Sequence, residues 1–238
     1  AHKQEVAAIV ANPEAPSFQN TIEALERSGE LYARASRVFN AVTGANTNDT
    51  LQDVERTLAP EEAAHGDDII LNPELYARVR AVWDQRESLG LDPEQLTLLQ
   101  ETNKQFIRSG AALDDAAKAR LREINKEIAE LSQKYSQNVL DETNAYELHV
   151  TDTMDLGDLP ASLVELAAAE AKRRGHDTGW SFTLQRPSIN PFLESYTNRE
   201  LRKNIFDGYD MRGDNGNERD NKTVAAKMAA LRAERAKL

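Results

Sequence analysis

The sequence feature that most constrains the fold is an uninterrupted stretch, residues 114–146, that contains neither proline nor glycine. Its large apolar residues recur at steps of three and four, which places them on one face of a helix. They are Leu121, Ile124, Ile128, Leu131, Tyr135 and Val139. Because the last step is four where a strict heptad requires three, the stripe favours a straight helix of a globular protein. A helix of roughly 33 residues spans on the order of 50 Å, so we expect other helices to pack along it.

Composition excludes several kinds of site and partner. The chain has 238 residues, of which 40% are apolar, enough for one large domain or two small ones. It has no cysteine, so disulfides, thiolate zinc sites and a cysteine nucleophile are excluded. The net charge of −11 opposes a general affinity for nucleic acid or anionic membranes, and we expect neither partner.

No stretch of the sequence has the build of a membrane segment. Apolar runs are too short to cross a bilayer, and the opening AHKQEVAAIV lacks the basic-then-apolar pattern of a signal peptide. We therefore expect a soluble cytoplasmic protein, with a periplasmic or exported parent as the alternative.

Two stretches carry strong helix-start signals, residues 72–74 (Asn-Pro-Glu) and residues 92–95 (Asp-Pro-Glu-Gln). Each has a capping side chain, proline at the first helical position and then an acid where the helix dipole favours it. Gly90 and Gly110 lie just beyond the expected ends of these helices. Since the connections are short, we expect antiparallel neighbours.

Proline and glycine divide the first 70 residues of the chain. A first helix is expected to end at the Asn12-Pro13 step, because a residue before proline avoids the helical region. A second helix is expected from Ser17 onward, with Gly29 as a weak point inside it. A third helix is expected to be capped by Asn48 or Asp49 and to kink or restart at Pro60.

The hydrophobic pattern changes after the long helix. Residues 180–185 alternate apolar and polar side chains, which predicts a half-buried strand, and residues 148–150 match the same pattern more weakly. Residues 160–174 between them predict a helix that Gly175 ends. We therefore predict a small strand-helix-strand insert, followed by further helices from about Pro187.

The predicted fold class is mostly α, an antiparallel helical array around one long helix with a small strand-helix-strand insert. We divide the chain into residues 1–146 for the array, 147–186 for the insert and 187–238 for the last helices. The final helix carries Val224, Met228, Leu231 and Leu238 without a stop signal, and the chain starts without methionine. We therefore expect both ends to be cut from a larger α-rich fold.

The histidines do not form the simplest zinc-hydrolase motif, H-E-x-x-H, which places two imidazoles and a glutamate at helical spacing. The residues that follow the four histidines are Lys3, Gly66, Val150 and Asp177. A metal cluster at residues 65–68 (His-Gly-Asp-Asp) is less favoured than a solvated turn between helices. His149 is interpreted as a structural or exposed strand residue and His176 as a loop residue, neither of them catalytic.

Other motifs carry little weight. Residues 214–221 are acidic enough to suggest calcium, but Ala225 stands where the bidentate glutamate of a calcium loop would lie. We predict a capping loop there. Residues 48–50 and 221–223 match the glycosylation pattern, which is too short to decide anything. No glycine-rich nucleotide loop or G-x-S-x-G serine elbow is present.

Several longer strings carry a specific resemblance. They include NPEAPSFQNTIEALERSGELYARASRVFNAVTGANTND, LNPELYARVRAVWDQRESLGLDPEQLTLL, FIRSGAALDDAAKARLREINKEIAELSQKYSQNVL and WSFTLQRPSINPFLESYTNRELRKNIFDGYDMRGDNGNERDN. These resemble the N-terminal region of the zinc metallopeptidase family of peptidyl-dipeptidase Dcp, oligopeptidase A and thimet oligopeptidase. The RGDNGNERDN string favours the Dcp branch, and the resemblance covers essentially the whole chain.

The resemblance implies a helical N-terminal part that faces a catalytic half across a deep channel. In that family the H-E-x-x-H helix and its zinc lie in the second half, so no catalytic, cofactor-binding or metal residue is carried over to this chain. The implied cofactor is zinc in the parent enzyme, with none bound by this part. The implied partners are the missing catalytic half and short peptides.

Two functional hypotheses follow. In the first, the chain is a non-catalytic part of a zinc-dependent peptidyl-dipeptidase or oligopeptidase, forms a wall of the substrate channel and is inactive alone. In the second, it is a stand-alone helical module that binds peptides or a protein without catalysis. Because the resemblance places the metal site outside this chain, the acids of the long helix, Glu123, Glu127 and Glu130, are interpreted as the solvated face of a support and not as metal ligands.

Overall fold

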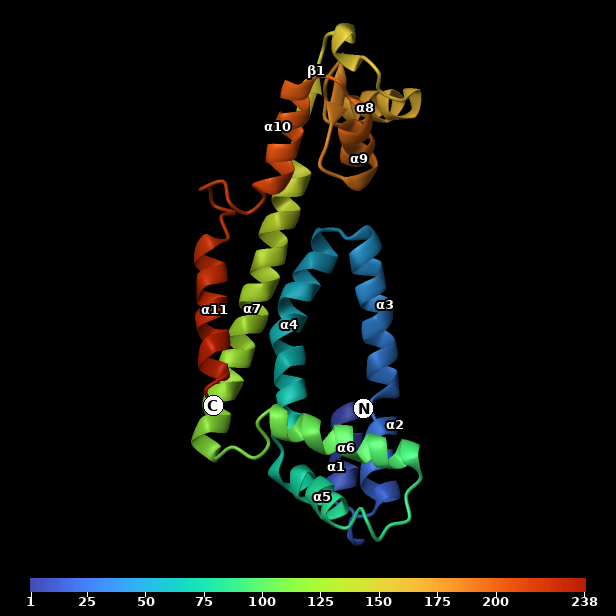
Figure 1. Ribbon diagram of the computed structural model, residues 1–238, viewed down its shortest axis with the longest axis vertical. Helices are drawn as coiled ribbons and strands as arrows, with labels where there is room; N and C mark the ends of the chain where they lie inside the picture. Colours follow the sequence, from blue (N-terminus) through green and yellow to red (C-terminus); the bar gives the residue numbers. More distant parts are fainter. The chain divides into compact units, whose positions relative to one another are not determined.

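The computed structural model describes the backbone of residues 1–238 and every side chain except that of Asp155. The chain forms two compact units, one of Ala1–Gln133 with Ala230–Leu238 and one of Lys134–Ala229. In the described part of the chain, sheet structure is limited to one antiparallel pair of strands, and helices dominate (Figure 1). The predicted mostly α fold class is confirmed. No described helix is both long and apolar enough to span a membrane.

The first unit is a series of helices. Their bounds are α1 His2–Val10, the π-helix η1 Phe18–Glu23, α2 Ala24–Arg27, α3 Glu30–Asn46, α4 Asp49–Ile70, α5 Pro73–Asp84 and α6 Pro93–Arg108. The long helix α7, Asp115–Ala145, matches the predicted stretch. Residues of α7 and of α11, Lys222–Arg235, belong to both units.

The predicted helix starts after Asn72 and Asp92 are confirmed. The Asn72 side chain accepts hydrogen bonds from the backbone N–H of Glu74 and Leu75, both at 2.9 Å. Asp92 and Gln95 form a reciprocal capping box. These contacts satisfy N–H groups that have no partner within the helix, so the two helices begin where the sequence indicates.

Glycine and proline act differently from the prediction in the first 70 residues. Gly29 has a φ of 75° and separates α2 from α3, so the single helix expected from Ser17 is wrong. A Cβ on Gly29 would lie 2.7 Å from the His2 ring, which leaves no room for a side chain. Pro60 lies inside α4, which does not restart there. Proline removes one backbone donor, a loss that a helix of 22 residues tolerates.

The core of the first unit contains one large cluster of buried apolar residues. It gathers side chains of α1, η1, α5 and α6, with Leu75, Val79 and Leu99 fully buried. The buried members are Val6, Ile9, Phe18, Ile22, Leu75, Val79, Val82, Leu99, Phe106 and Ala111. Helical periodicity on each helix therefore converges on one cluster.

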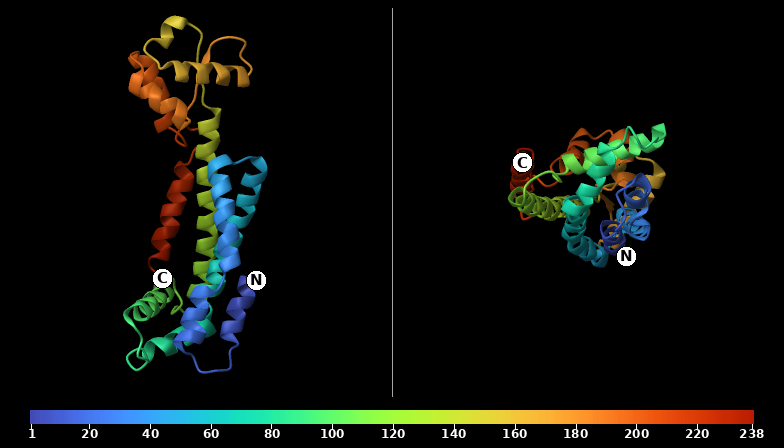
Figure 2. Two further views of the ribbon diagram at one scale, coloured as in Figure 1. Left: turned by 90° about the vertical axis from the view of Figure 1, so that its right-hand side faces the viewer. Right: turned by 90° about the horizontal axis from the view of Figure 1, so that it is seen from below.

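In the same unit, α3 and α4 form the two arms of a helical hairpin that turns at Thr47 and Asn48 (Figures 1 and 2). This hairpin buries little of its apolar surface: Leu31 is 58% exposed and Val38 is 62% exposed. Thr43 is the one buried residue of α3 among the described side chains, and α4 has none. The apolar side chains of this hairpin are thus exposed or only partly buried.

The apolar stripe predicted for α7 is buried only in part. Leu121 and Ile124 are buried, whereas Tyr135 is 40% exposed, so the expectation that other helices cover the stripe is wrong at Tyr135. The remaining members are partly buried, namely Ile128, Leu131 and Val139. Further along, the buried positions of the helix are polar, namely Asn138, Glu142 and Thr143. Apolar periodicity cannot locate positions that are buried through hydrogen bonds.

The second unit contains the predicted insert. Its elements are β1 Leu148–Val150, the 3-10 helix η2 Thr153–Leu156, α8 Ala161–Arg173, β2 Trp180–Phe182, α9 Arg186–Ser195 and α10 Arg199–Asp210. The strands are antiparallel and pair His149 with Ser181. The strand-helix-strand order is confirmed, with β2 shorter than the predicted alternation.

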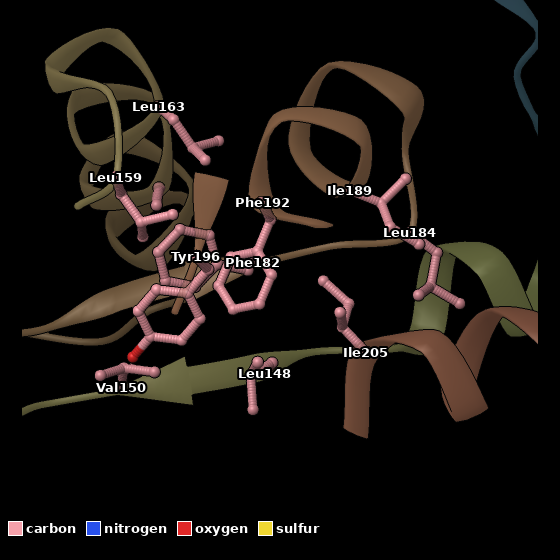
Figure 3. Packing of buried hydrophobic residues seen from close by; sticks show 11 residues of the cluster. Leu148, Val150, Leu159, Leu163, Phe182, Leu184, Ile189, Phe192, Tyr196 and Ile205 are labelled. Carbon is pink, nitrogen blue, oxygen red and sulfur yellow. The ribbon is translucent and has the colours of Figure 1, made fainter. Parts of the chain in front are cut away.

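Aromatic side chains form the centre of the second unit. The rings of Phe182, Phe192 and Tyr196 lie together, with Leu148 and Val150 of β1 on one side (Figure 3). The Phe182 and Phe192 ring centroids are 4.7 Å apart and those of Phe192 and Tyr196 4.6 Å, within the range of favourable ring contacts. This cluster fixes the sheet and hence the polar groups on its other side.

Candidate functional site

The candidate site of the second unit lies along its two-stranded sheet. Glu147 immediately precedes β1, His149 is the middle residue of β1, and Ser181 is the middle residue of β2. Antiparallel pairing places His149 opposite Ser181. His176 comes from the loop between α8 and β2, after Gly175 ends the helix with a φ of 90°.

These four side chains form a chain of hydrogen bonds. The Ser181 hydroxyl donates to Glu147 Oε1 at 2.5 Å, and His149 Nδ1 lies 3.0 Å from Ser181 Oγ. His176 Nε2 lies 2.9 Å from the same Glu147 oxygen. Because the single hydroxyl proton of Ser181 goes to Glu147, Ser181 Oγ accepts the proton of His149 Nδ1. The contacts therefore set the tautomer of His149, with its lone pair on Nε2.

The carboxyl group of Glu147 is held in its ionised form. Burial raises the pKa of Glu147, but hydrogen bonds from Ser181 and His176 lower it by more, and the nearby Arg174 charge adds to them. The net shift of the Glu147 pKa is downward. Since an ionised carboxylate only accepts hydrogen bonds, His176 Nε2 is the donor in that contact.

The two imidazole rings stack on each other, and a glycine makes room for them. The ring centroids of His149 and His176 are 3.9 Å apart and the planes differ by 16°. A Cβ on Gly179 would lie 2.7 Å from His149 Cε1 and 2.8 Å from His149 Nε2. Gly179 also has a φ of 92°, which side chains rarely adopt. Only glycine can pack this closely against that edge of the His149 ring.

A polar cavity of about 510 Å³ adjoins this cluster through Ser181. Glu170 and Arg173 of α8 line it, together with Arg174, the C-cap residue of α8. Hydrogen bonds from both arginines lower the pKa of Glu170 to about 2, and the bond from Arg173 has the largest effect. The remaining lining residues of the cavity are Thr143, Asn144, Leu166, Thr183, Gln185, Pro187 and Ser188. Glu170 pairs with both arginines, so its single negative charge offsets one of the two positive charges beside the cavity.

The cluster of Glu147, His149 and His176 was not anticipated from the sequence, which assigned the two histidines to an ordinary strand and an ordinary loop. The two histidines are 27 positions apart and meet only because the sheet folds back. The available signal was the strand pairing itself, since residues 148–150 and 180–182 were both predicted as strands. A hairpin register drawn between them places His149 beside Ser181.

The other predicted candidate, residues 65–68, does not gather into a metal site. His65 lies inside α4, so the predicted turn is wrong, and its Nε2 is 2.9 Å from His2 Nδ1. Asp67 accepts a hydrogen bond from Asn125, and Asp68 pairs with Lys3 and Arg122. Among the described residues, these side chains are not part of any group of three close metal-ligand atoms.

Residues 212–221, which we name the Glu142 loop, are ordered around a buried carboxylate. Glu142 of α7 is 6% exposed and accepts hydrogen bonds from Gly213 N, Asn215 Nδ2 and Asn217 Nδ2. Burial raises the pKa of Glu142, but these bonds lower it by more. Asn221, within a predicted glycosylation pattern, is 3% exposed, which closes it to modification. The loop therefore surrounds the Glu142 carboxylate with N–H donors.

The chain is similar in sequence to several curated peptidases. The chain is 38% identical over 99% of its length to dipeptidyl carboxypeptidase of Escherichia coli K12, of which it covers 35%. It is 28% identical over 94% of its length to a probable cytosolic oligopeptidase A of Arabidopsis thaliana, covering 32% of that protein. It is 25% identical over 99% of its length to oligopeptidase A of E. coli K12, covering 35%.

No protein-family profile matches the chain. The chain spans about a third of the length of these curated relatives, all of which are named as peptidases. The identity to the dipeptidyl carboxypeptidases is higher than that to the oligopeptidases A, in agreement with the resemblance of the RGDNGNERDN string. By sequence, the chain fits the family of dipeptidyl carboxypeptidase and oligopeptidase A over about a third of the length of these relatives.

Proposed function

We propose that this chain is a non-catalytic helical part of a zinc-dependent peptidyl-dipeptidase that removes dipeptides from the C-termini of short peptides. The observation that carries the proposal is the 38% identity to dipeptidyl carboxypeptidase along 99% of the chain, which covers 35% of that relative. The remaining two thirds of such a parent protein would hold the reaction centre. This chain would supply a wall of the substrate channel.

The residues of this chain do not fit the zinc site of the proposed parent. That site needs two imidazoles and a glutamate at H-E-x-x-H spacing on one helix. Here the histidines meet in two separate pairs, His2 with His65 and His149 with His176, and no pair lies on one helix. Hydrolysis is therefore assigned to the rest of the parent, and the contribution of this chain is to bind, position and exclude substrates by size.

A direct experiment compares the 238-residue chain with the full-length parent in a cleavage assay of a blocked short peptide with zinc present. We expect dipeptide release by the parent and none by the chain alone. Cleavage by the chain at a rate comparable to that of the parent would overturn the division of labour. The coding sequence beyond Leu238 is a second test, because the proposal requires an H-E-x-x-H motif there.

A stand-alone binding module is the alternative, and one surface of the first unit favours it. The α3–α4 hairpin and the start of α1 form an apolar groove of about 740 Å³, lined by Leu31, Phe39 and Leu58 among others. Such a groove suits an apolar peptide or helix. A stop codon directly after Leu238, with peptide binding by the isolated chain, would favour the module over the peptidase.

A further inference from the structure

We propose that Glu147, His149 and His176 form a binding site for a divalent transition metal of the zinc class, which links β1 to the loop between α8 and β2. The sequence predicted no metal ligand in this chain, and the proposed peptidase activity does not require this site. The proposal therefore stands or falls independently of the proposed function.

The donor set is the first argument. Two imidazoles and one carboxylate are ligands that zinc accepts readily, and they leave a fourth position for water. Imidazole nitrogen also suits nickel, cobalt and copper, whereas calcium and magnesium require mainly oxygen ligands. The site is thus selective for the transition-metal class by its chemistry.

The spacing of the donor atoms is the second argument. One ligand atom from each of Glu147, His149 and His176 lies within 4.8 Å of the other two. Glu147 Oε1 and His176 Nε2 are already 2.9 Å apart, and the metal would displace the proton that His176 Nε2 donates to Glu147, which would be released to solvent. Two ligands on one tetrahedral zinc are about 3.3 Å apart, as follows from bond lengths of about 2.0 Å. The Glu147–His176 pair has nearly this separation, and His149 needs to approach by about 1 to 2 Å on the same basis.

The surroundings of His149 are the third argument. Its Nδ1–H donates to Ser181 Oγ, and Ser181 is 1% exposed, so this contact is sheltered from water. Ligating histidines commonly donate their other ring N–H to a fixed acceptor, which orients the ring and selects the tautomer. Nε2 of His149 accepts no hydrogen bond from any side chain that the structure describes.

Metal binding requires one local movement. A metal lies in the plane of the imidazole that binds it, but the planes of His149 and His176 are nearly parallel, 16° apart. One ring must therefore rotate. His149 is held in the sheet, whereas His176 lies in a loop and its side chain is 35% exposed, so His176 is the ring that turns.

The site would act as a cross-link within the second unit. β1 and the α8–β2 loop are joined at this end by side-chain contacts of Glu147, which the metal would replace with coordinate bonds. The Glu147 and His176 side chains are 24% and 35% exposed, so the remaining position is open to water. Binding to the folded state alone raises its stability by mass action.

The test uses the metal-free 238-residue chain and zinc alone as the probe. The chain has four histidines and no cysteine, so histidine side-chain NMR resolves every imidazole. We expect zinc to shift the ring signals of His149 and His176. Zinc affinity is then measured by competition with a chromophoric chelator in a His2→Gln/His65→Gln background, which removes the other histidine pair.

Two variants in that background test the ligands. We expect His176→Gln and Glu147→Gln each to weaken zinc binding by at least about 10- to 100-fold, because mutation of a residue that only hydrogen-bonds to a metal ligand already has an effect of this size. Far-UV circular dichroism without zinc checks the fold. If Glu147→Gln disturbs the fold through Ser181, His176→Gln decides, because the His176 ring lies in a loop and bonds only to Glu147 among the described side chains.

The outcomes are distinguishable. One zinc bound per chain, lost in His176→Gln while the fold is retained, supports the site. The proposal is overturned if the background chain binds no zinc, if His176→Gln changes the affinity by less than about twofold, or if zinc shifts only the rings of His2 and His65. Peptidase activity of the parent plays no part in any of these readouts.

Discussion

The apolar core of the first unit and the Glu142 loop of the second unit are ordered by different interactions. Apolar side chains of α1, η1, α5 and α6 meet in one buried cluster. The Glu142 loop instead surrounds one buried carboxylate and a buried asparagine, Asn221, which bonds to Asn138 and to the Tyr135 carbonyl. In the core, the loss of apolar volume is costly, whereas in the loop the loss of an acceptor is costly.

The two tryptophans allow these regions to be followed separately. Trp83 packs against the core of the first unit and Trp180 against that of the second unit. A Trp180→Phe variant therefore reports the first unit, and a Trp83→Phe variant the second. The comparison can then be tested by denaturation experiments with one fluorescent probe in each case.

The largest effect is expected from Phe106→Ala in the apolar core. Phe106 is 2% exposed, and truncating a buried phenylalanine costs about 3–5 kcal/mol of unfolding free energy. Its neighbour Ile107 is 44% exposed, so Ile107→Ala should cost less than about 1 kcal/mol. Urea denaturation followed by Trp83 fluorescence measures both variants, and equal losses would show that this cluster is not the core of the unit.

A smaller but specific effect is expected from Glu142→Gln. The substitution keeps the shape of the side chain but replaces one acceptor oxygen by a donor, which leaves the buried N–H of Gly213 or an asparagine amide without a partner. A lost buried hydrogen bond of this kind costs about 1–3 kcal/mol.

Glu165 provides the matched control for Glu142→Gln. It is exposed on α8, so Glu165→Gln should change stability by less than about 0.5 kcal/mol. Denaturation followed by Trp180 fluorescence measures both variants. If Glu142→Gln were as silent as the control, the loop would not depend on the buried carboxylate.

The sequence could predict those features of the fold that depend on neighbouring residues or on the apolar face of a single helix. The starts of α5 and α6 were predictable because a capping residue and proline act on their immediate neighbours. The core of the first unit was predictable from the apolar face of each helix. The break at Gly29 was not predictable because the close approach of the His2 ring, which excludes a side chain at Gly29, is a contact between separate helices.

Polar contacts between distant residues were not predictable. The partners of Glu142 are 71 to 75 positions away, and nothing in the periodicity of α7 distinguishes Glu142 from its exposed acids. His149 and His176 are likewise brought together by strand pairing and by the loop after α8. A single sequence carries local signals for helices and caps, but a hydrogen-bonded cluster requires the register of the fold.

A pH experiment separates ionic from apolar stabilisation in the second unit. The Arg173 and Arg174 side chains lower the pKa of Glu170 to about 2, from an ordinary value of 4.5. A carboxyl group whose folded pKa is lowered stabilises the fold above its unfolded pKa, and this contribution disappears as the pH falls from about 4.5 to about 2. Since Arg173 is 68% exposed, we expect only about 1 kcal/mol at neutral pH.

Glu170→Gln should remove this contribution and flatten the acid limb of the stability profile, with Glu165→Gln on the same helix as the control. Denaturation at several pH values between about 2 and 7, followed by Trp180 fluorescence, measures it. A first-unit variant such as Phe106→Ala should lower stability across the whole range. An acid limb unchanged by Glu170→Gln would assign the acid sensitivity to other carboxyl groups, Glu142 first among them.

The smallest effect tests whether polar contacts also matter at the edge of the apolar core. Asn72→Ala removes a side chain that accepts hydrogen bonds from the N–H groups of Glu74 and Leu75. The loss of such a cap costs about 1 kcal/mol, less than a core truncation because water can replace the exposed bond. Asn72→Asp retains the acceptor and should restore most of the stability measured by Trp83 fluorescence. If alanine and aspartate were equally stable, Pro73 and the packing of Leu75 would suffice to start α5, and the first unit would depend on apolar contacts alone.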